Sequence, residues 1–326
     1  MKNKRFGNPL RLIIFLLPVL VFIIALGSNM DTNSNNTTST ITGVPTSNVE
    51  KDSPKSTGNL KVHFIDVGQA DSILIQQGNN NMLIDAGNNS DSDLVMNYLK
   101  NQGVNKLDYI IGTHPHEDHI GGLDVVVKNF NTDKIFLPKV TSNTVTFKDL
   151  AAAIKNKGLN ITTPKVGTSY NLGEATWTIL APNSASYDEI NNYSIVIHLQ
   201  YKNNSFMFTG DAENISENEI LQKQLNLKAD VLKIGHHGSS SSTSNSFLNK
   251  VNPKYAIISV GKNNDYGHPH KPTMERLKSK GITVYRTDEC GTIIATSDGT
   301  NITFDTKPGS YSYSSSANHT SITNKN

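Results

Sequence analysis

Two stretches of the chain repeat the same order of predicted elements. In the first, S-I-L-I-Q and N-M-L-I-D-A-G predict a strand hairpin ending at Asp85, then a helix, the strand D-Y-I-I-G-T and His114. In the second, S-I-V-I-H-L-Q-Y and S-F-M-F-T-G-D predict a hairpin ending at Asp211, then a helix, the strand D-V-L-K-I-G and the pair His236 and His237. The separation is 29 residues from Asp85 to His114 and 26 residues from Asp211 to His237. Two such units are expected to pack sheet against sheet, with helices outside and the strand ends at one edge.

Residues 59–306 divide into short elements by their hydrophobic spacing. Strands are predicted at residues 60–66, 72–76, 81–85, 109–113, 134–137, 176–180, 194–201, 205–209, 231–234, 255–260, 283–285 and 291–296. Helices are predicted at residues 93–101, 122–130, 147–157, 216–225, 244–251 and 273–280. A body of this size is sufficient for a single α/β domain.

The two ends of the chain have a different composition from this body. Residues 1–27 combine a basic start with an apolar run at 12–26, which is the layout of a secretory signal and is short for a membrane span. We therefore expect either a cleaved signal peptide or an N-terminal membrane anchor. Both would place the body outside the cytoplasm, secreted or tethered to the outer face of the membrane. Residues 28–58 and 307–326 are rich in Ser, Thr and Asn and are predicted to be a disordered linker and tail.

Charge and cysteine content exclude several classes of protein. The formal net charge is +2, and four cations lie in the first 27 residues, which contain no acid, so the remainder carries −2. Such a body is not a strongly basic nucleic-acid binder. The single cysteine, Cys290, rules out an intrachain disulfide and any zinc site built from cysteines.

The segment T-H-P-H-E-D-H-I-G-G, residues 113–122, carries the strongest chemical signal in the chain. It places three histidines and two acids in six positions, directly after an apolar strand. Imidazole nitrogens and carboxylate oxygens together suit zinc, manganese or iron. Uncompensated histidines this close together would repel one another when protonated. We therefore predict that His114 and His116 point to one metal ion, and that Asp118 and His119 point to another.

This segment resembles the H-x-H-x-D-H signature of the metallo-β-lactamase superfamily. The resemblance implies an α/β (α+β) fold, a four-layer αββα sandwich, with a hydrolytic site for two divalent metal ions, zinc or alternatively manganese. It implies that Asp85 orients the cluster and that Asp211 bridges the two ions. In H-H-G-S, residues 236–239, it implies a ligand for the second ion, which we assign to His237 with His236 as the alternative. The resemblance covers nearly all of residues 60–300.

A narrower resemblance is to the extracellular hydrolase domain of ComEC-type competence proteins. It rests on F-I-D-V-G-Q-A-D-S, N-N-Y-S-I-V, L-K-I-G-H-H-G-S and Y-G-H-P-H, together with the two aspartate segments. It implies a phosphodiesterase or nuclease whose metal-bridged hydroxide attacks phosphorus, with DNA as a possible substrate. Full-length members also carry a membrane channel of many helices, whereas this chain has one apolar run. We expect contact with a membrane only through the N-terminal segment and see no sign of an obligate protein partner.

Further residues are expected to support the site. Asp66 and Asp71 flank a glycine turn and could orient ligating imidazoles, although turn chemistry also explains them. Many superfamily members place another histidine before the bridging aspartate, but His198 lies in the middle of a strand and is interpreted as structural. Asn192, or alternatively Asn191, at the start of that strand, is better placed for a contact at the edge. His268 could hold a phosphoryl oxygen or protonate the leaving group, which makes it, with Asp118, a candidate catalytic residue.

Two other functions remain open at this point. The same fold could hydrolyse a lactam or lactone, with which the near-neutral body is compatible. The domain could instead be a non-catalytic extracellular module that keeps a metal for stability. Phosphorylcholine esterases of the same fold are similar in their H-H-G-S segment, so choline phosphodiesters are a further possible substrate class.

Overall fold

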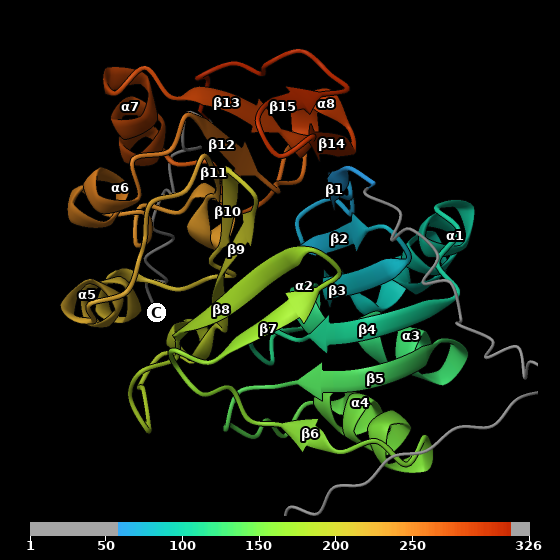
Figure 1. The fold of residues 1–326 in the computed structure, drawn as a ribbon. Helices are drawn as coiled ribbons and strands as arrows, with labels where there is room; N and C mark the ends of the chain where they lie inside the picture. The colour runs from blue at the N-terminus through green and yellow to red at the C-terminus, as the bar shows by residue number, and fades with distance from the viewer. Residues whose placement is uncertain (1–57, 314–326) are drawn as a thin grey trace, which may run out of the picture. The chain divides into compact units, whose positions relative to one another are not determined.

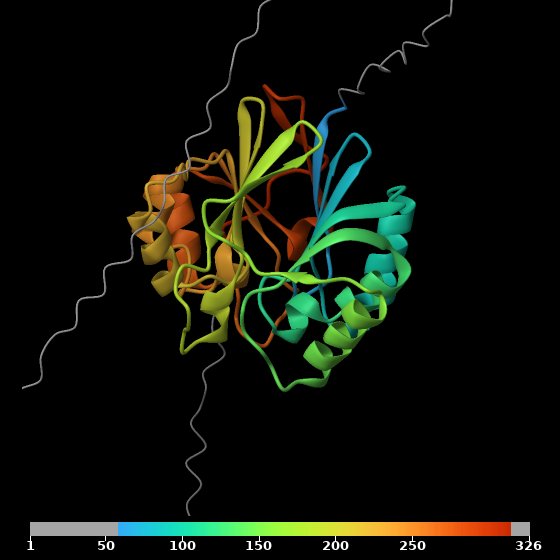
Figure 2. The ribbon, with the colours of Figure 1, turned by 60° about the horizontal axis from the view of Figure 1, so that its bottom comes forward.

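The structure, a computed structural model, describes residues 58–313. The predicted leader at 1–27, residues 28–57 of the predicted linker and residues 314–326 of the predicted tail lie outside the described residues. The described chain forms two sheets that face each other, with helices on their outer sides (Figures 1 and 2).

The first sheet is built mainly from the N-terminal half of the body and has eight strands in the order β15-β14-β1-β2-β3-β4-β5-β6. Its strands are β1 (Leu60–Phe64), β2 (Ser72–Gln77), β3 (Asn80–Ala86), β4 (Lys106–Ile111), β5 (Asn131–Phe136), β6 (Ile161–Thr162), β14 (Ile293–Ser297) and β15 (Ile302–Phe304). The pairs β3–β4, β4–β5 and β5–β6 are parallel, and the other pairs are antiparallel. The C-terminal ends of β3 and β4 therefore meet at the same edge of the sheet.

The second sheet has seven strands in the order β13-β12-β11-β10-β9-β8-β7. Its strands are β7 (Ser169–Leu172), β8 (Ala175–Ala181), β9 (Val196–Tyr201), β10 (Asn204–Phe208), β11 (Val231–Lys233), β12 (Tyr255–Ile258) and β13 (Thr283–Arg286). Strands β10 to β13 are parallel to one another. Their C-terminal ends form the corresponding edge of this sheet.

Helices cover the outer face of each sheet. The longer helices are α1 (Ser92–Asn101), α3 (Leu123–Asn129) and α4 (Val145–Asn156) on the first sheet, and α5 (Asn214–Gln222), α6 (Asn245–Val251) and α7 (Lys271–Ser279) on the second. The short helices are α2 (Glu117–Ile120), α8 (Thr287–Cys290), η1 (Asn89–Asp91), η2 (Ile190–Tyr193) and η3 (Gly235–Gly238). Figure 2 shows the two sets of longer helices on opposite sides of the paired sheets. The predicted αββα sandwich is thereby confirmed.

The strand sequences explain this layering. In β3, Met82 and Ile84 pack into the core between the sheets, whereas Leu83 packs under the helices of the first half. In β10, Phe206 and Phe208 face the core between the sheets, and Met207 faces the helices of the second half. Successive side chains of a strand point to opposite faces, so strands that are apolar throughout must be covered on both sides.

The structure corrects several predicted boundaries. The short strands β6, β7 and β15 were not predicted, because few of their residues are buried and they lack the apolar alternation of the other strands. Residues 307–313 of the predicted tail also belong to the body. The N–H of Gly309 donates to the carbonyl of Val284 at 2.8 Å, and the Tyr311 hydroxyl donates to the carbonyl of Ile282 at 2.6 Å. Within residues 58–313, no helix combines the length and apolar character needed to cross a bilayer.

Candidate metal centre

The predicted site residues meet where the C-terminal ends of strands from both sheets come together. Asp85 lies near the C-terminal end of β3, and residues 113–119 follow β4 of the first sheet. Asp211 follows β10, and the pair 236–237 follows β11, both in the second sheet. The site is therefore assembled from both halves of the sandwich, as the repeated order of elements predicts.

Asp85 anchors the loop that follows β4. One of its carboxylate oxygens accepts a hydrogen bond from the backbone N–H of Thr113 at 2.8 Å, and the other accepts from the Thr113 hydroxyl at 2.7 Å. His119 Nδ1 lies 2.8 Å from Asp85 Oδ2, so this nitrogen carries its proton toward the carboxylate. The Nε2 lone pair of His119 is then directed away from Asp85, as in imidazoles that bind a metal.

Four side chains bring one donor atom each to a common point: Asp118, His119, Asp211 and His237. These four atoms lie within 4.8 Å of one another. Asp211 Oδ2 is 3.3 Å from His119 Nε2 and 3.6 Å from His237 Nε2. His237 Nδ1 lies 3.0 Å from the carbonyl oxygen of Ser259 and donates to it, which leaves its Nε2 facing the cluster. Two imidazoles and two carboxylates are a donor set that suits zinc or manganese.

His114 and His116 form a second pair of donors beside this cluster. His114 Nε2 lies 3.0 Å from His116 Nδ1, so the two nitrogens approach one point. His114 Nδ1 lies 3.2 Å from the Thr113 hydroxyl and 3.4 Å from the Ser194 hydroxyl. These two contacts orient the ring on the side opposite to Nε2. Ser194 also accepts a hydrogen bond at 3.0 Å from the backbone N–H of Asp211, and so links this pair to the carboxylate.

Buried atoms without partners show that these residues fit a cation. Within the described residues, His119 Nε2 and Asp211 Oδ1 are buried and have no hydrogen-bond partner. Leaving such atoms unsatisfied costs about 1–3 kcal/mol each, and buried polar groups are almost always paired. A divalent cation within reach of the four donors would satisfy both atoms.

The carboxylates of the cluster dominate its electrostatics. Burial disfavours the charged form of His119, but Asp211, Asp118 and Asp85 outweigh it and raise the pKa of His119 well above its ordinary value. Burial of Asp211 is likewise outweighed by His119 and His237, which hold the pKa of this carboxyl well below its usual range. His114, which lies farther from the carboxylates, has its pKa lowered well below the ordinary value, chiefly by burial. The Asp211 carboxylate is therefore charged, as metal binding requires.

The two adjacent histidines after β11 have different surroundings. Both residues have positive φ, 50° for His236 and 52° for His237, a conformation that non-glycine residues adopt mainly where the surroundings enforce it. His237 is buried in the four-donor cluster. The side chain of His236 is 24% exposed, with Nε2 3.7 Å from Asp211 and Nδ1 3.3 Å from Glu213 Oε1. His237 thus has the ligand-like position, and His236 lies at the edge of the cluster.

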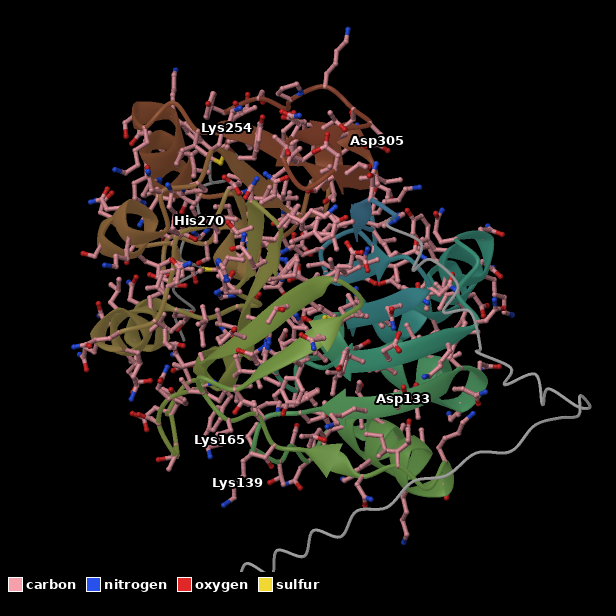
Figure 3. All side chains as sticks on the ribbon, viewed as in Figure 1. Asp133, Lys139, Lys165, Lys254, His270 and Asp305 are labelled. Carbon is pink, nitrogen blue, oxygen red and sulfur yellow. The ribbon has the colours of Figure 1, made fainter. Side chains whose placement is uncertain are left out.

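A cavity of about 290 Å³ opens above the cluster. Its lining residues are Gln69, His116, Glu117, Asp118, Asp211, His236, His237, Tyr266 and His268. His268 lies in the segment between β12 and α7, which the label of His270 marks in Figure 3. The His268 ring stacks on that of Tyr266, with centroids 5.7 Å apart, and Tyr266 is 70% exposed at the cavity mouth. The predicted proximity of His268 to the cluster is thus what the structure shows.

Two residues expected to touch the centre have other partners. The Asp66 carboxylate accepts a hydrogen bond from the backbone N–H of Gly68 at 3.2 Å, which is a local contact within the turn. Among the described residues, no histidine forms a hydrogen bond with Asp66. Asn192 is buried, and its side-chain oxygen accepts from the N–H groups of Glu213 and Ser216 at the start of α5. Asn192 therefore caps a helix rather than contacting the cluster. His198 lies outside the site as expected, with Nε2 2.8 Å from the carbonyl oxygen of Lys228.

A buried ion pair that was not predicted from the sequence lies beneath the cluster. Lys233 Nζ lies 2.6 Å from Asp71 Oδ2, and both side chains are almost fully buried. Asp71 Oδ1 is 3.4 Å from His237 Nδ1, so the pair supports the cluster from below. The single lysine in the apolar strand L-K-I-G was the available signal, because an unpaired charge would not be tolerated in a buried strand. Thr113, which joins Asp85 to the histidines, carried no comparable signal.

Comparison with known proteins identifies related sequences. The family model described as the metallo-beta-lactamase superfamily matches residues 65–164 and 186–262. ComE operon protein 3 of Bacillus subtilis is 33% identical over 253 residues, which are 72% of this chain and 32% of that protein. Recombination protein 2 of Haemophilus influenzae is 33% identical over 223 residues, which are 67% of this chain and 26% of that protein. Competence protein ComA of Neisseria gonorrhoeae is 29% identical over 238 residues, which are 70% of this chain and 31% of that protein.

These matches confirm the resemblance to ComEC-type competence proteins and account for the motifs on which it rests. The chain spans about a third or less of the length of these relatives. Functions of the remaining parts of those proteins are therefore not assigned to this chain.

Proposed function

The chain belongs to the metallo-beta-lactamase superfamily, and on that premise we propose that it is a metal-dependent phosphodiesterase acting on a nucleic acid, with DNA as the first candidate. The observation that carries the proposal is the set of four donors, Asp118, His119, Asp211 and His237, at the base of an open cavity. The family match directly supports a metallo-hydrolase fold, and the donor set supplies a candidate metal site within it.

The names of the relatives favour a nucleic acid as substrate. They include a recombination protein and a competence protein, and both names concern the handling of DNA. The exposed ring of Tyr266 at the cavity mouth offers a face on which a planar group next to the scissile phosphate can stack. Stacking of a base on an aromatic side chain contributes about 1–3 kcal/mol and does not depend on a basic surface. This would compensate for the lack of excess positive charge on the body.

The residues of this chain would divide the work as follows. Asp118, His119 and His237 would hold one cation, His114 and His116 would hold the other, and Asp211 would contact both. Zinc suits this donor set best and manganese is the alternative. Bound cations would supply Lewis-acid polarisation of the phosphoryl group and a water of lowered pKa. Asp85 keeps the Nδ1 proton of His119, and the Ser259 carbonyl keeps that of His237, so that both Nε2 atoms are free to bind.

His268 would act on the substrate from the side of the cavity. It is nearly buried, lines the cavity and lies beside His236, with ring centroids 5.4 Å apart. A phosphoryl oxygen of the substrate in the cavity would be within reach of its ring. Because of residues 1–27, we further propose that the protein works outside the cytoplasm, where DNA from other cells is available.

The test is hydrolysis of bis(p-nitrophenyl) phosphate, single-stranded DNA, double-stranded DNA and RNA by the zinc-loaded protein, beside a chromogenic β-lactam. Asp118→Ala and His119→Ala should each bind less zinc and lose about 100-fold or more in turnover, because each removes a donor of the same cation. His198→Gln is the matched control, since it replaces a buried histidine outside the cluster and should keep both zinc and activity.

Each contrary outcome is distinct. Wild-type turnover by Asp118→Ala with unchanged metal content would refute the assignment of the centre. Cleavage of the β-lactam without cleavage of any phosphodiester would replace the proposed reaction with lactam hydrolysis. Stoichiometric zinc with no turnover of any substrate would favour a non-catalytic metal-binding module.

A further inference from the structure

The side chain of Gln69 lies between two segments that are far apart in the sequence. It comes from the turn between β1 and β2, and it contacts the segment that joins β12 to α7. Its Oε1 accepts a hydrogen bond from the backbone N–H of Gly261 at 3.0 Å, and its Nε2 lies 3.3 Å from His268 Nδ1. A β-carbon at Gly261 would lie 2.6 Å from the backbone nitrogen of Gln69, so this approach requires glycine.

The bond from Gly261 decides which way the Gln69 amide is turned. A backbone N–H can only donate, so the atom facing it must be the carbonyl oxygen of the side chain. The NH₂ group is then the part that faces His268, and an amide NH₂ can only donate. His268 Nδ1 must therefore accept, and the proton of the neutral ring is on Nε2.

The surroundings hold His268 in this state. Asn264 accepts from the backbone N–H of His268 at 3.0 Å and donates to its carbonyl at 2.7 Å, so the main chain is clamped on both sides. Because Nδ1 accepts from the NH₂ group of Gln69, the ring holds a single proton and is uncharged. Among the described residues His268 Nε2 has no hydrogen-bond partner, and the ring lines the cavity above the metal-binding residues.

We propose that Gln69 is a positioning residue that holds His268 as the neutral imidazole protonated on Nε2, so that His268 donates a hydrogen bond to an oxygen of the substrate in the cavity. The assignment of the ring proton follows from the hydrogen bonds alone, whereas the role toward substrate rests on the proposed function. The position of the ring proton decides between the two roles expected for His268, which were binding a phosphoryl oxygen and protonating the leaving group. A neutral imidazole offers a hydrogen bond to developing negative charge, but giving up its only ring proton would leave an imidazolate. Binding of the phosphoryl oxygen therefore replaces protonation of the leaving group as its role.

The first experiment reads the ring proton directly and needs no substrate. Long-range ¹H–¹⁵N correlation spectra are recorded on the zinc-loaded protein with ¹⁵N-labelled histidines. The signals of His268 are assigned by comparison with His268→Asn. We expect an unprotonated Nδ1 and a protonated Nε2. In Gln69→Glu the second carboxylate oxygen can only accept, so Nδ1 should become protonated. A protonated Nδ1 in the unaltered protein, or an Nδ1 that stays unprotonated in Gln69→Glu, would overturn the proposal.

The second experiment is a double-mutant cycle on bis(p-nitrophenyl) phosphate. His268→Ala removes the donor and should lower kcat by about 100-fold, the usual effect of losing one such hydrogen bond. Gln69→Met should lower kcat about tenfold with unchanged zinc content, because the donor remains but its proton is no longer held on Nε2. In the double variant, Gln69→Met should not lower kcat below that of His268→Ala, because Gln69 acts only through His268. Full multiplication of the two effects would refute the coupling.

Gln76→Met is the control for the loss of a partly buried amide. Gln76 belongs to β2 and donates to Asn81 Oδ1 at 2.9 Å, and it lines a different cavity from Gln69. It should leave kcat unchanged. If the protein cleaves no phosphodiester at all, the proposed function fails while the spectra still decide whether Gln69 sets the ring proton.

Discussion

His63 is a buried histidine whose chemistry is separate from the candidate metal centre. It lies on β1 and is 1% exposed, and its Nδ1 is 2.9 Å from the hydroxyl of Tyr98 on α1. Burial, with a smaller contribution from Lys61, lowers the pKa of His63 to about 4. The folded protein therefore keeps this imidazole neutral at a pH where an unfolded chain would protonate it.

This difference predicts a loss of stability in acid. Below a pH of about 6.5 the unfolded chain binds a proton at His63 that the folded protein does not bind until about pH 4, so stability falls as the pH falls through this window. His63→Phe keeps an aromatic ring beside Tyr98 but cannot titrate. Between pH 7.5 and 4.5, wild type should lose about 2–3 kcal/mol more of its free energy of unfolding than this variant, as measured by urea denaturation. If the free energy of unfolding of the two proteins changed equally with pH, the lowered pKa of His63 would be contradicted.

At the scale of elements, α2 is the part of the fold that depends most on its neighbours. It has four residues, 117–120, two of which are predicted ligands, and a helix this short has no stability of its own. The backbone N–H of Asp71 donates to the carbonyl of Asp118 at 3.0 Å, and Ile120 is buried. At its end, a β-carbon on Gly121 would lie 2.3 Å from backbone atoms of Asn88 and Asn89. The position of α2 is therefore set by direct backbone contact with the segment after β3.

Gly121→Ala should disturb both stability and the metal centre. The added methyl group meets backbone rather than a flexible side chain, so α2 or the 88–89 segment must move. We expect a loss of about 1–3 kcal/mol in the free energy of unfolding, together with reduced zinc content. Gly103→Ala is the control: its φ is +72° but no atom lies within 4 Å of the new β-carbon, so it should cost about 1 kcal/mol and leave zinc binding intact. Equal zinc content in the two variants would argue against the predicted role of α2.

At the scale of the whole molecule, the candidate centre joins the two sheets where their strand ends meet. Asp118 and His119 follow β4 of the first sheet, whereas Asp211 follows β10 and His237 follows β11 of the second sheet. Away from this edge the sheets are held together by the apolar core between them, which includes Trp177 of β8. A bound cation would therefore connect the two halves directly, at the place where polar side chains replace that core.

Metal binding should consequently stabilise the entire domain. Zinc at about 100 times its Kd should add about 3 kcal/mol to the free energy of unfolding, because the unfolded chain does not bring the donors together. A chelator should lower the Tm of the zinc-loaded protein in a single cooperative transition. Asp211→Asn, in which a buried donor is weakened, should show a much smaller shift on the same treatment. The Tm measured by circular dichroism is independent of any substrate, and equal shifts in both proteins would contradict the assignment.

Much of the architecture could be predicted because its signals are local. The continuous apolar runs of β3 and β10 require sheets covered on both faces, and the repeated hairpin, helix and strand order predicts two such sheets. The ligand types at 114–119 likewise predict a cation site without knowledge of the fold. The strands β6, β7 and β15 were missed because their pairing depends on neighbours rather than on their own pattern.

By itself, the sequence determined the layers of this protein, the edge at which its polar residues gather and the chemical nature of that site. Tertiary structure alone decided which neighbour each side chain meets. From the sequence His236 remained an alternative to His237 as a ligand, whereas in the structure the hydrogen bond to the Ser259 carbonyl directs His237 Nε2 into the cluster. Asp66 and Asp71 flank the same turn, but only Asp71 meets Lys233 and His237. The physical reason is that ligand type is a property of one residue, whereas the direction of a ring or carboxylate is set by hydrogen bonds from segments distant in the chain.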